Sequence, residues 1–90
     1  MTIRELPEET RLIQLAEEAS ELAQACLKMV RVMDGDSPVP EQWARDNLIE
    51  EIADVSVCMT AVQDIAPLAQ VGEIINQKAQ RWEDRINGEG

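Results

Sequence analysis

The chain has 90 residues, of which 18 are acidic and 8 are basic, so its net charge is −10. This length fits one small domain, residues 1–90, that cannot bury a large core on its own. Such an acidic chain is expected to bind neither nucleic-acid polymers nor anionic membranes. The absence of histidine excludes a His-assisted Ser or Cys nucleophile and a di-iron site built on Glu-x-x-His.

The remaining composition indicates a cytoplasmic protein that associates with itself. No apolar run approaches the length of a membrane span, and no N-terminal segment has the pattern of an export signal. Cys26 and Cys58 lie in helical patterns without metal-type spacing, so reduced thiols are expected, although one disulfide stays open. The only aromatic residues are Trp43 and Trp82. Because large core side chains are scarce, burial across a subunit interface is expected, and with it an oligomer.

Three helices are expected, and no strand alternation competes with them. The first is predicted from about Leu6 or Pro7 to about Val32, because apolar residues recur three and four positions apart. Its predicted inward stripe consists of Leu12, Ala16, Ala19, Leu22, Ala23, Cys26 and Val30. The segment DGDSPVP, residues 34–40, is rich in turn-forming residues and should end this helix in the one long loop.

The second helix is expected to follow Pro40, which suits the first turn of a helix. It begins either as a short piece at Glu41–Arg45 that restarts near Asp46, or as one continuous helix. It should end before Ala66-Pro67. Its predicted stripe consists of Leu48, Ile49, Ile52, Val55, Met59 and Val62.

The third helix is expected to open at Pro67. Its predicted stripe consists of Leu68, Val71, Ile75, Ala79, Trp82 and Ile86. The last residues, Gly88-Glu89-Gly90, should form a frayed tail. The predicted fold is therefore all-α, a compact helical bundle of three to four helices.

Two acidic clusters need an explanation, EEASE at residues 17–21 and EEIAD at residues 50–54. Like charges three or four residues apart on a helix repel each other, so repeating the cluster costs energy. On a helical wheel, two acids of each cluster lie at about −100° and −160° from the centre of their apolar stripe. If the two stripes pack together, four carboxylates converge along one seam, those of Glu18, Glu21, Glu51 and Asp54.

Four convergent carboxylates would suit Mg²⁺ or Mn²⁺, which take oxygen ligands, keep several waters and accept phosphate oxygens as further ligands. Glu17 and Glu50 are spare acids beside the same seam. The chemistry that such a site supports is attack on phosphorus by a metal-activated water. The alternative is that both clusters are solvated faces of an acidic protein.

A basic stripe follows on the third helix, at Lys78, Arg81 and Arg85. Their spacing of three and four puts the three cations on one flank. There they can meet phosphate oxygens that a metal does not hold. The alternative is that they stabilise the end of the helix through its dipole, or pair with nearby acids.

The ordered set of motifs resembles the MazG-like family of all-α nucleoside triphosphate pyrophosphohydrolases. EEASEL at 17–22 and EEIADV at 50–55 match its Glu-x-x-Glu and Glu-x-x-Asp motifs, and INQKAQRWEDRI at 75–86 is similar to its last helix, which bears Lys and Arg. The resemblance implies a helical bundle that completes its active site by dimerising, in some members as a dimer of dimers. A homodimer or a homotetramer is therefore expected.

The resemblance also implies an activity, the Mg²⁺-dependent cleavage of a nucleoside or deoxynucleoside triphosphate into monophosphate and diphosphate for nucleotide-pool housekeeping. By this resemblance, the catalytic metal ligands would be Glu18, Glu21, Glu51 and Asp54. The substrate phosphates would be bound by Lys78 and Arg81, with Arg85 and Asn76 as further candidates. Water polarised by Mg²⁺ would attack the α-phosphorus, and Glu17 or Glu50 would orient it.

The chain departs from the family at positions that concern the base. Val57-Cys58 stands where many members carry an aromatic residue, and Trp43 is the one candidate left for stacking on a base. The related phosphoribosyl-ATP pyrophosphatases carry a histidine after the aspartate that this chain lacks. Two other functions fit the same sequence. One is a non-catalytic helical module that binds a partner protein, and the other is a nucleotide or metal sensor without turnover.

Overall fold

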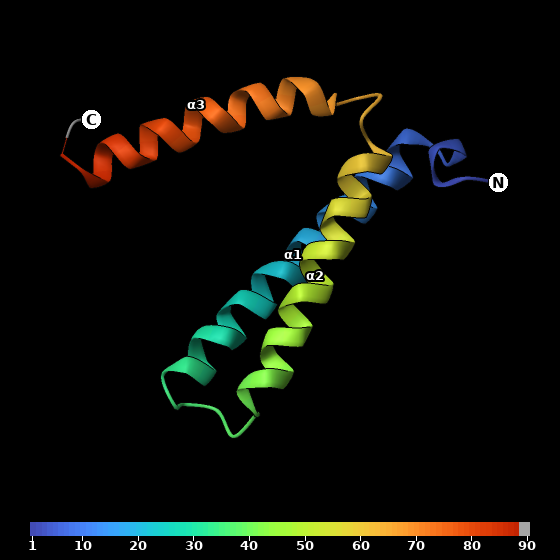
Figure 1. Ribbon diagram of the computed structural model, residues 1–90. Coiled ribbons are helices and arrows are strands. Elements are labelled where there is room, and N and C mark those ends of the chain that lie inside the picture. Colours follow the sequence, from blue (N-terminus) through green and yellow to red (C-terminus); the bar gives the residue numbers. More distant parts are fainter. Residues whose placement is uncertain (89–90) are drawn as a thin grey trace.

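The computed structural model describes residues 1–88, and its regular secondary structure is entirely helical. A short 3-10 helix, η1, spans Ile3–Glu5. Three long helices follow, α1 at Glu8–Met33, α2 at Glu41–Ala61 and α3 at Leu68–Ile86 (Figure 1). The prediction of an all-α chain with three long helices is confirmed.

Each long helix begins directly after a proline, as the sequence predicts. Pro7, Pro40 and Pro67 have φ values between −54° and −60°, and the carbonyl of each accepts the first main-chain hydrogen bond of its helix, at 3.1–3.2 Å. A proline suits this position because it has no N–H that would need a partner. At the other end of α1, Asp34 caps the helix and Gly35 has a φ of +78°, which glycine adopts without strain.

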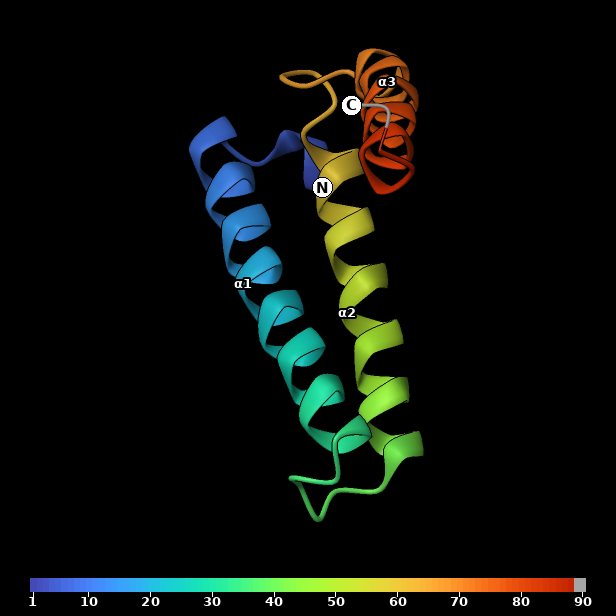
Figure 2. The same ribbon diagram turned by 90° about the vertical axis from the view of Figure 1, so that its left-hand side faces the viewer.

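α1 and α2 form an antiparallel hairpin joined by the loop at residues 34–40 (Figures 1 and 2). α2 is continuous through Asp46, so the prediction of one unbroken helix holds. The less exposed residues of the two helices recur at alternating spacings of three and four, as in a coiled coil. The least exposed residues of α1 include Arg11, Leu15, Glu18, Leu22, Ala25, Met29 and Val32. Those of α2 and its end include Ala44, Leu48, Glu51, Val55, Cys58 and Val62.

The apolar stripes predicted from the sequence therefore coincide only in part with the faces that pair within the hairpin. On α1 only Leu22 of the predicted stripe is among the less exposed residues, whereas Leu48, Val55 and Val62 of the second stripe do lie at the interface. Leu12 on α1 is 43% exposed and Ile52 on α2 is 50% exposed. The actual interface was not recognised because it contains charged side chains where an apolar residue is expected, at Arg11, Glu18 and Glu51. The exposed members of the predicted stripes, such as Leu12, Val30 and Ile52, form an outer apolar face that neither helix of the hairpin covers.

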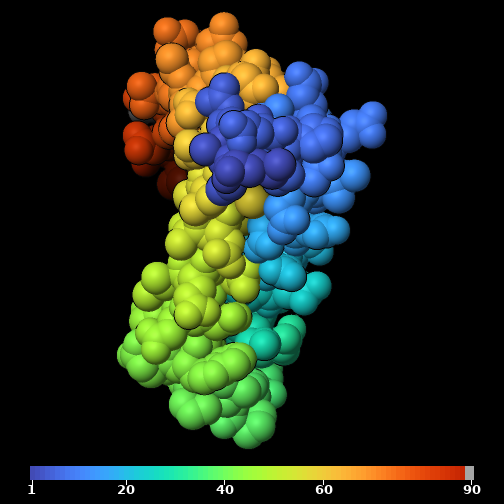
Figure 3. Space-filling view, turned by 90° about the vertical axis from the view of Figure 1, so that its right-hand side faces the viewer, coloured from blue at the N-terminus to red at the C-terminus, as the bar shows by residue number. Residues whose placement is uncertain are grey.

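The N-terminal segment closes the open end of the hairpin by lying against the end of α2 (Figure 3). Nη1 and Nη2 of Arg11 donate to Oδ1 and Oδ2 of Asp64 at 2.6 Å and 3.1 Å. Arg11 also donates to the carbonyl oxygens of Ala61 and Leu6, at 2.8 Å and 2.9 Å. Hydrogen bonding to Asp64 raises the pKa of Arg11, and the same bond lowers the pKa of Asp64. This bidentate pair fixes the start of α1 to the turn after α2.

α3 extends away from the hairpin instead of packing along it (Figure 1). None of its residues is buried, and Ile75 and Trp82 of its predicted stripe are 55% and 66% exposed. The radius of gyration is 16.5 Å, whereas a compact domain of this length would have about 12 Å. A single chain is thus less compact than a closed bundle, because α3 does not pack along the hairpin within residues 1–88. The prediction that dimerisation completes the bundle stays a prediction.

Two further expectations concern the cysteines and the tail. Cys26 and Cys58 are both free, the first exposed and the second buried, so the disulfide left open by the sequence is not formed. The tail expected at Gly88-Glu89-Gly90 lies outside the described residues from Glu89 onward. Across the described helices, none combines the length and the apolar character that a membrane span requires.

Candidate metal centre

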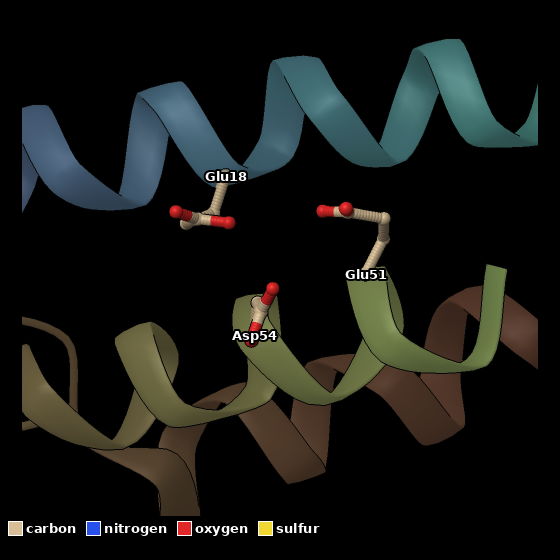
Figure 4. Close-up of side chains that lie close together, drawn as sticks. All are labelled: Glu18, Glu51 and Asp54. Atoms are coloured by element: carbon tan, nitrogen blue, oxygen red, sulfur yellow. The ribbon is translucent and has the colours of Figure 1, made fainter. Parts of the chain in front are cut away.

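Three carboxylates converge between α1 and α2 (Figure 4). Glu18 from α1, and Glu51 and Asp54 from α2, each present one oxygen, and these oxygens all lie within 4.8 Å of one another. Figure 4 shows the three side chains reaching into the space between the two helices. The fold therefore brings together three of the four carboxylates that the sequence proposes as metal ligands.

Glu18 and Glu51 lie in the interface of the hairpin. The sequence pattern had predicted that they would lie on its flank, beside the apolar stripes. Both are half-buried, and the Oε2 atom of each is shielded from solvent without a hydrogen-bond partner among residues 1–88. The other oxygen of Glu18 accepts a hydrogen bond from Nε2 of Gln14 at 3.0 Å. A desolvated carboxylate oxygen without a partner costs free energy. A cation between the helices would supply the missing interaction.

The mutual repulsion of these acids changes their ionisation. The pKa of Glu51 is raised, chiefly by desolvation and then by the charges of Asp54 and Glu18. The pKa of Glu21 is raised chiefly by the charge of Glu18, with smaller effects from Glu51 and Asp54. Each of the two therefore holds a proton more tightly than a free glutamate, and a bound cation would relieve the same repulsion.

The donor set fits a hard divalent cation. Carboxylate oxygens alone make up the cluster, and such ligands suit Mg²⁺ and Mn²⁺. Cys58 is buried nearby, and its pKa is raised by burial first and by the charges of Glu18 and Asp54 second. Sulfur is in addition a soft ligand that suits Mg²⁺ and Mn²⁺ less well than carboxylate oxygen.

The other acids proposed from the sequence lie around this triad. Glu21 is exposed and is not one of the three residues whose oxygens converge, but it lines a pocket together with Glu51. Glu17 and Glu50 are exposed and lie outside the triad. The charge of Glu50 contributes least to the raised pKa of Glu51. The geometry assigns neither Glu17 nor Glu50 a place beside the converging oxygens.

The predicted phosphate-binding residues lie on a different part of the chain. An open groove of about 590 Å³ on α3 is lined by Lys78, Arg81, Trp82, Arg85 and Ile86. Asn76 is exposed on the same helix but does not line this groove. Because α3 leaves the hairpin after Pro67, the expected meeting of these residues with the carboxylates does not occur within one chain (Figure 1).

A pocket of about 400 Å³ adjoins the carboxylates and was not predicted from the sequence. Its lining residues are Glu21, Gln24, Ala25, Leu27, Lys28, Arg31, Asn47 and Glu51. The signal that would have revealed it is a spacing of seven residues, two helical turns, which puts Glu21 and Lys28 on one face and Gln24 and Arg31 beside them. This face was overlooked because the apolar stripe of α1 was assigned elsewhere.

Comparisons with known proteins gave no match for this chain. No protein-family model matches it, and neither a curated protein nor a solved structure does. The interpretation of the site therefore rests on the positions and chemistry of its own residues and on the order of the motifs in the sequence.

Proposed function

We propose that the chain is a Mg²⁺-dependent nucleoside triphosphate pyrophosphohydrolase, which converts a nucleoside or deoxynucleoside triphosphate and water into the monophosphate and diphosphate. The observation that carries the proposal is the convergence of Glu18, Glu51 and Asp54 from two helices, with two shielded carboxylate oxygens that have no partner among residues 1–88. The motif resemblance to the MazG-like family supports the choice of reaction. Mn²⁺ suits the same oxygen ligands.

In this proposal Glu18, Glu51 and Asp54 hold the cation. When bound, Mg²⁺ would neutralise phosphate charge and activate water and phosphorus for hydrolysis. The partial burial of Glu18 and Glu51 strengthens their attraction for a cation, since charges interact more strongly where water is excluded. Glu21 adds a carboxylate beside the site, in the pocket that it lines together with Glu51.

The proposal includes a homodimer or homotetramer. Large apolar side chains are exposed on the outer face of the hairpin and along α3, among them Leu12, Leu27, Val30, Ile49, Ile52, Ile75, Trp82 and Ile86. Apolar surface of this extent favours association. In such an assembly, α3 of one subunit would bring Lys78, Arg81 and Arg85 toward the acidic hairpin of another, where opposite charges favour the approach.

The same exposed surface also supports the rival function, a non-catalytic module that binds another protein. The test of the enzymatic function is diphosphate release from a panel of canonical and modified triphosphates, read by a phosphate-coupled assay. We expect release with Mg²⁺ and none with EDTA. Glu51→Gln or Asp54→Asn should lower kcat at least about 100-fold, since even outer residues of metal sites are worth about 10–100-fold. Glu73→Gln, an exposed acid on α3, is the matched control and should leave the rate unchanged.

Three outcomes separate the candidate functions. Diphosphate release that depends on Mg²⁺ and on Glu51 supports the enzyme. Thermal stabilisation by Mg²⁺ and nucleotide together, without any product across the panel, would show a sensor and overturn the enzymatic function. No product and no effect of Mg²⁺ on stability, in a chain that circular dichroism shows to be folded, would leave the interaction module.

A further inference from the structure

We propose that the pocket between α1 and α2 is a polyphosphate subsite, in which Lys28 and Arg31 bind the diphosphate portion of the substrate. The inference rests on the proposed function and deepens it, because it names the part of the substrate that this pocket takes. It also assigns a role to residues of α1 that the sequence motifs do not include. The pocket has a volume of about 400 Å³ and shares Glu51 with the carboxylate triad.

Opposite charges follow each other along this pocket. Glu21 and Glu51 contribute carboxylates, and Lys28 and Arg31 contribute cations. Lys28 comes seven residues after Glu21, so its Cα lies about 10 Å farther along the axis of α1. A ligand that spans the pocket must therefore reach a cation held by the carboxylates and two basic side chains farther along the helix. A chain of phosphate groups has the charge and the extension for both contacts.

Lys28 and Arg31 are cations without acidic partners. The ion pairs among residues 1–88 involve the N-terminus, Arg4, Arg11 and Arg45, and neither Lys28 nor Arg31 takes part in one. The basic residues of α3 are also absent from these ion pairs, so what sets Lys28 and Arg31 apart is their place in a pocket beside the carboxylates. Cations kept free of acids are available to bind phosphate oxygens, which Arg can contact with two N–H groups at once.

Trp43 holds Lys28 in position. The Nζ atom of Lys28 lies 4.8 Å from the centre of the Trp43 ring, and the lysine is half-buried. This cation–π contact restricts the side chain before a ligand arrives, so less conformational entropy is lost on binding. The ring face that Lys28 covers is not available for stacking on a base. Trp43 thereby supports a phosphate-binding cation, which differs from the base-stacking role considered from the sequence.

Neutral donors complete the lining. Gln24 and Asn47 line the same pocket, one from each helix, and each has a side-chain amide that can donate. Together with Lys28 and Arg31, these amides give the pocket several hydrogen-bond donors beside its carboxylates. A fully ionised phosphate group has only hydrogen-bond acceptors, whereas a nucleoside carries both donors and acceptors. A phosphate group therefore matches these donors better than a nucleoside does.

The test is the binding of inorganic pyrophosphate to the full chain in the presence of Mg²⁺, measured by isothermal titration calorimetry. Lys28→Met and Arg31→Gln should each weaken the binding about tenfold, the size expected for losing one charge-assisted contact. Arg45→Gln is the matched control, because Arg45 pairs with Glu41 at 3.4 Å and does not line the pocket. It should change the Kd by less than about twofold. Arg31 is exposed, so Arg31→Gln keeps the test valid if Lys28→Met does not fold.

Unchanged pyrophosphate affinity in folded Lys28→Met and Arg31→Gln would overturn the inference. The inference would also be overturned if the two variants bound a nucleoside monophosphate more weakly than the native chain but bound pyrophosphate equally well. The pocket would then take the nucleoside. The readout needs no turnover. Pyrophosphate binding that depends on Lys28 and Arg31, in a chain that hydrolyses no nucleotide, would support this subsite and overturn the enzymatic function. Nucleotide hydrolysis, together with pyrophosphate binding that depends on neither residue, would support the enzymatic function and overturn this subsite.

Discussion

Arg11 is paired through two hydrogen bonds with Asp64, at 2.6 Å and 3.1 Å, across the open end of the hairpin. The side chain of Arg11 is 4% exposed, whereas that of Asp64 is 31% exposed. The guanidinium is therefore the more deeply enclosed partner, and Asp64 is the carboxylate that compensates its charge. Arg4 also lies near Asp64, with 3.8 Å between Nε and Oδ1, but its side chain is 51% exposed.

Asp64→Asn should destabilise the chain, because it leaves the enclosed guanidinium of Arg11 without a counter-ion. We expect the Tm to fall by roughly 5–15 °C, as for loss of one strong enclosed interaction in a small domain. Arg4→Gln removes the exposed neighbour of the same carboxylate and should shift the Tm by less than about 2 °C. Thermal unfolding followed by circular dichroism measures both values, and equal shifts would show that enclosure of Arg11 is unimportant.

The ionisation of Asp64 also predicts acid sensitivity. Its pKa in the folded chain is lowered by Arg11, so its contribution to stability is present above the unfolded value of about 3.9 and is lost as the pH falls through the lower folded value. The free energy of unfolding of the native chain should therefore drop on acidification below about pH 4 more steeply than that of Asp64→Asn. Urea unfolding at a series of pH values measures this, and parallel curves would contradict it.

Glu51→Gln should stabilise the metal-free chain at neutral pH. The pKa of Glu51 is raised in the fold, mainly by desolvation, so its ionisation lowers stability as the pH rises from the unfolded value of about 4.3 through the raised folded value. Glutamine stays neutral and avoids this loss. The Tm in EDTA at pH 7 should exceed that of the native chain, and the difference should shrink toward pH 4. A lower Tm at pH 7 would show that the glutamate charge is already compensated.

Mg²⁺ should raise the Tm of the native chain but not that of Glu51→Gln. A ligand at tenfold excess over its Kd stabilises the folded state by about 1.4 kcal/mol, which corresponds to a few degrees in a chain of this size. Differential scanning fluorimetry over a Mg²⁺ series gives this shift. Glu73→Gln, which removes one charge from α3, should respond as the native chain does. If all three chains responded alike, the stabilisation would be a general salt effect and not binding at the triad.

Association is predicted to depend on the exposed apolar faces. Ile75→Lys on α3 puts a charge where an apolar side chain is 55% exposed, and it should weaken subunit association roughly tenfold or more. Gln70→Lys adds the same charge at an exposed polar position of the same helix and should leave association unchanged. Sedimentation velocity over a concentration series distinguishes them. A native chain that stays monomeric at high concentration would show that α3 has no partner in a second copy.

Local features of the sequence were sufficient to predict the helices. Pro7, Pro40 and Pro67 mark where each long helix begins, and the turn residues at 34–40 mark where α1 ends. These features act through neighbouring residues, so no tertiary contact is needed to recognise them. The continuous path of α2 through Asp46 was one of two alternatives that local propensity allowed.

Which face of each helix packs against the other could not be predicted in the same way. α1 and α2 each carry two apolar faces, and several large side chains, such as Leu12 and Ile52, lie on the outer one. The inner one contains small residues and charges, including Ala25, Arg11 and Glu18. Which face pairs depends on how closely two backbones approach and on whether each enclosed charge finds a partner, as Arg11 does in Asp64. A pattern within one helix does not record those conditions.

The sequence by itself determined three helices, where each begins, where the first ends, and two acidic clusters set in equivalent helical frames. Only the tertiary structure decided that Glu18 and Glu51 lie between the helices, that Lys28 and Arg31 share a pocket with them, and that the cations of α3 stay apart within one chain. The physical reason is the separation along the sequence of the residues whose contacts decide each feature. Helix starts and turns are decided by contacts between residues a few positions apart. Whether like charges are enclosed at an interface depends on the sum of repulsion, desolvation and packing over the whole hairpin.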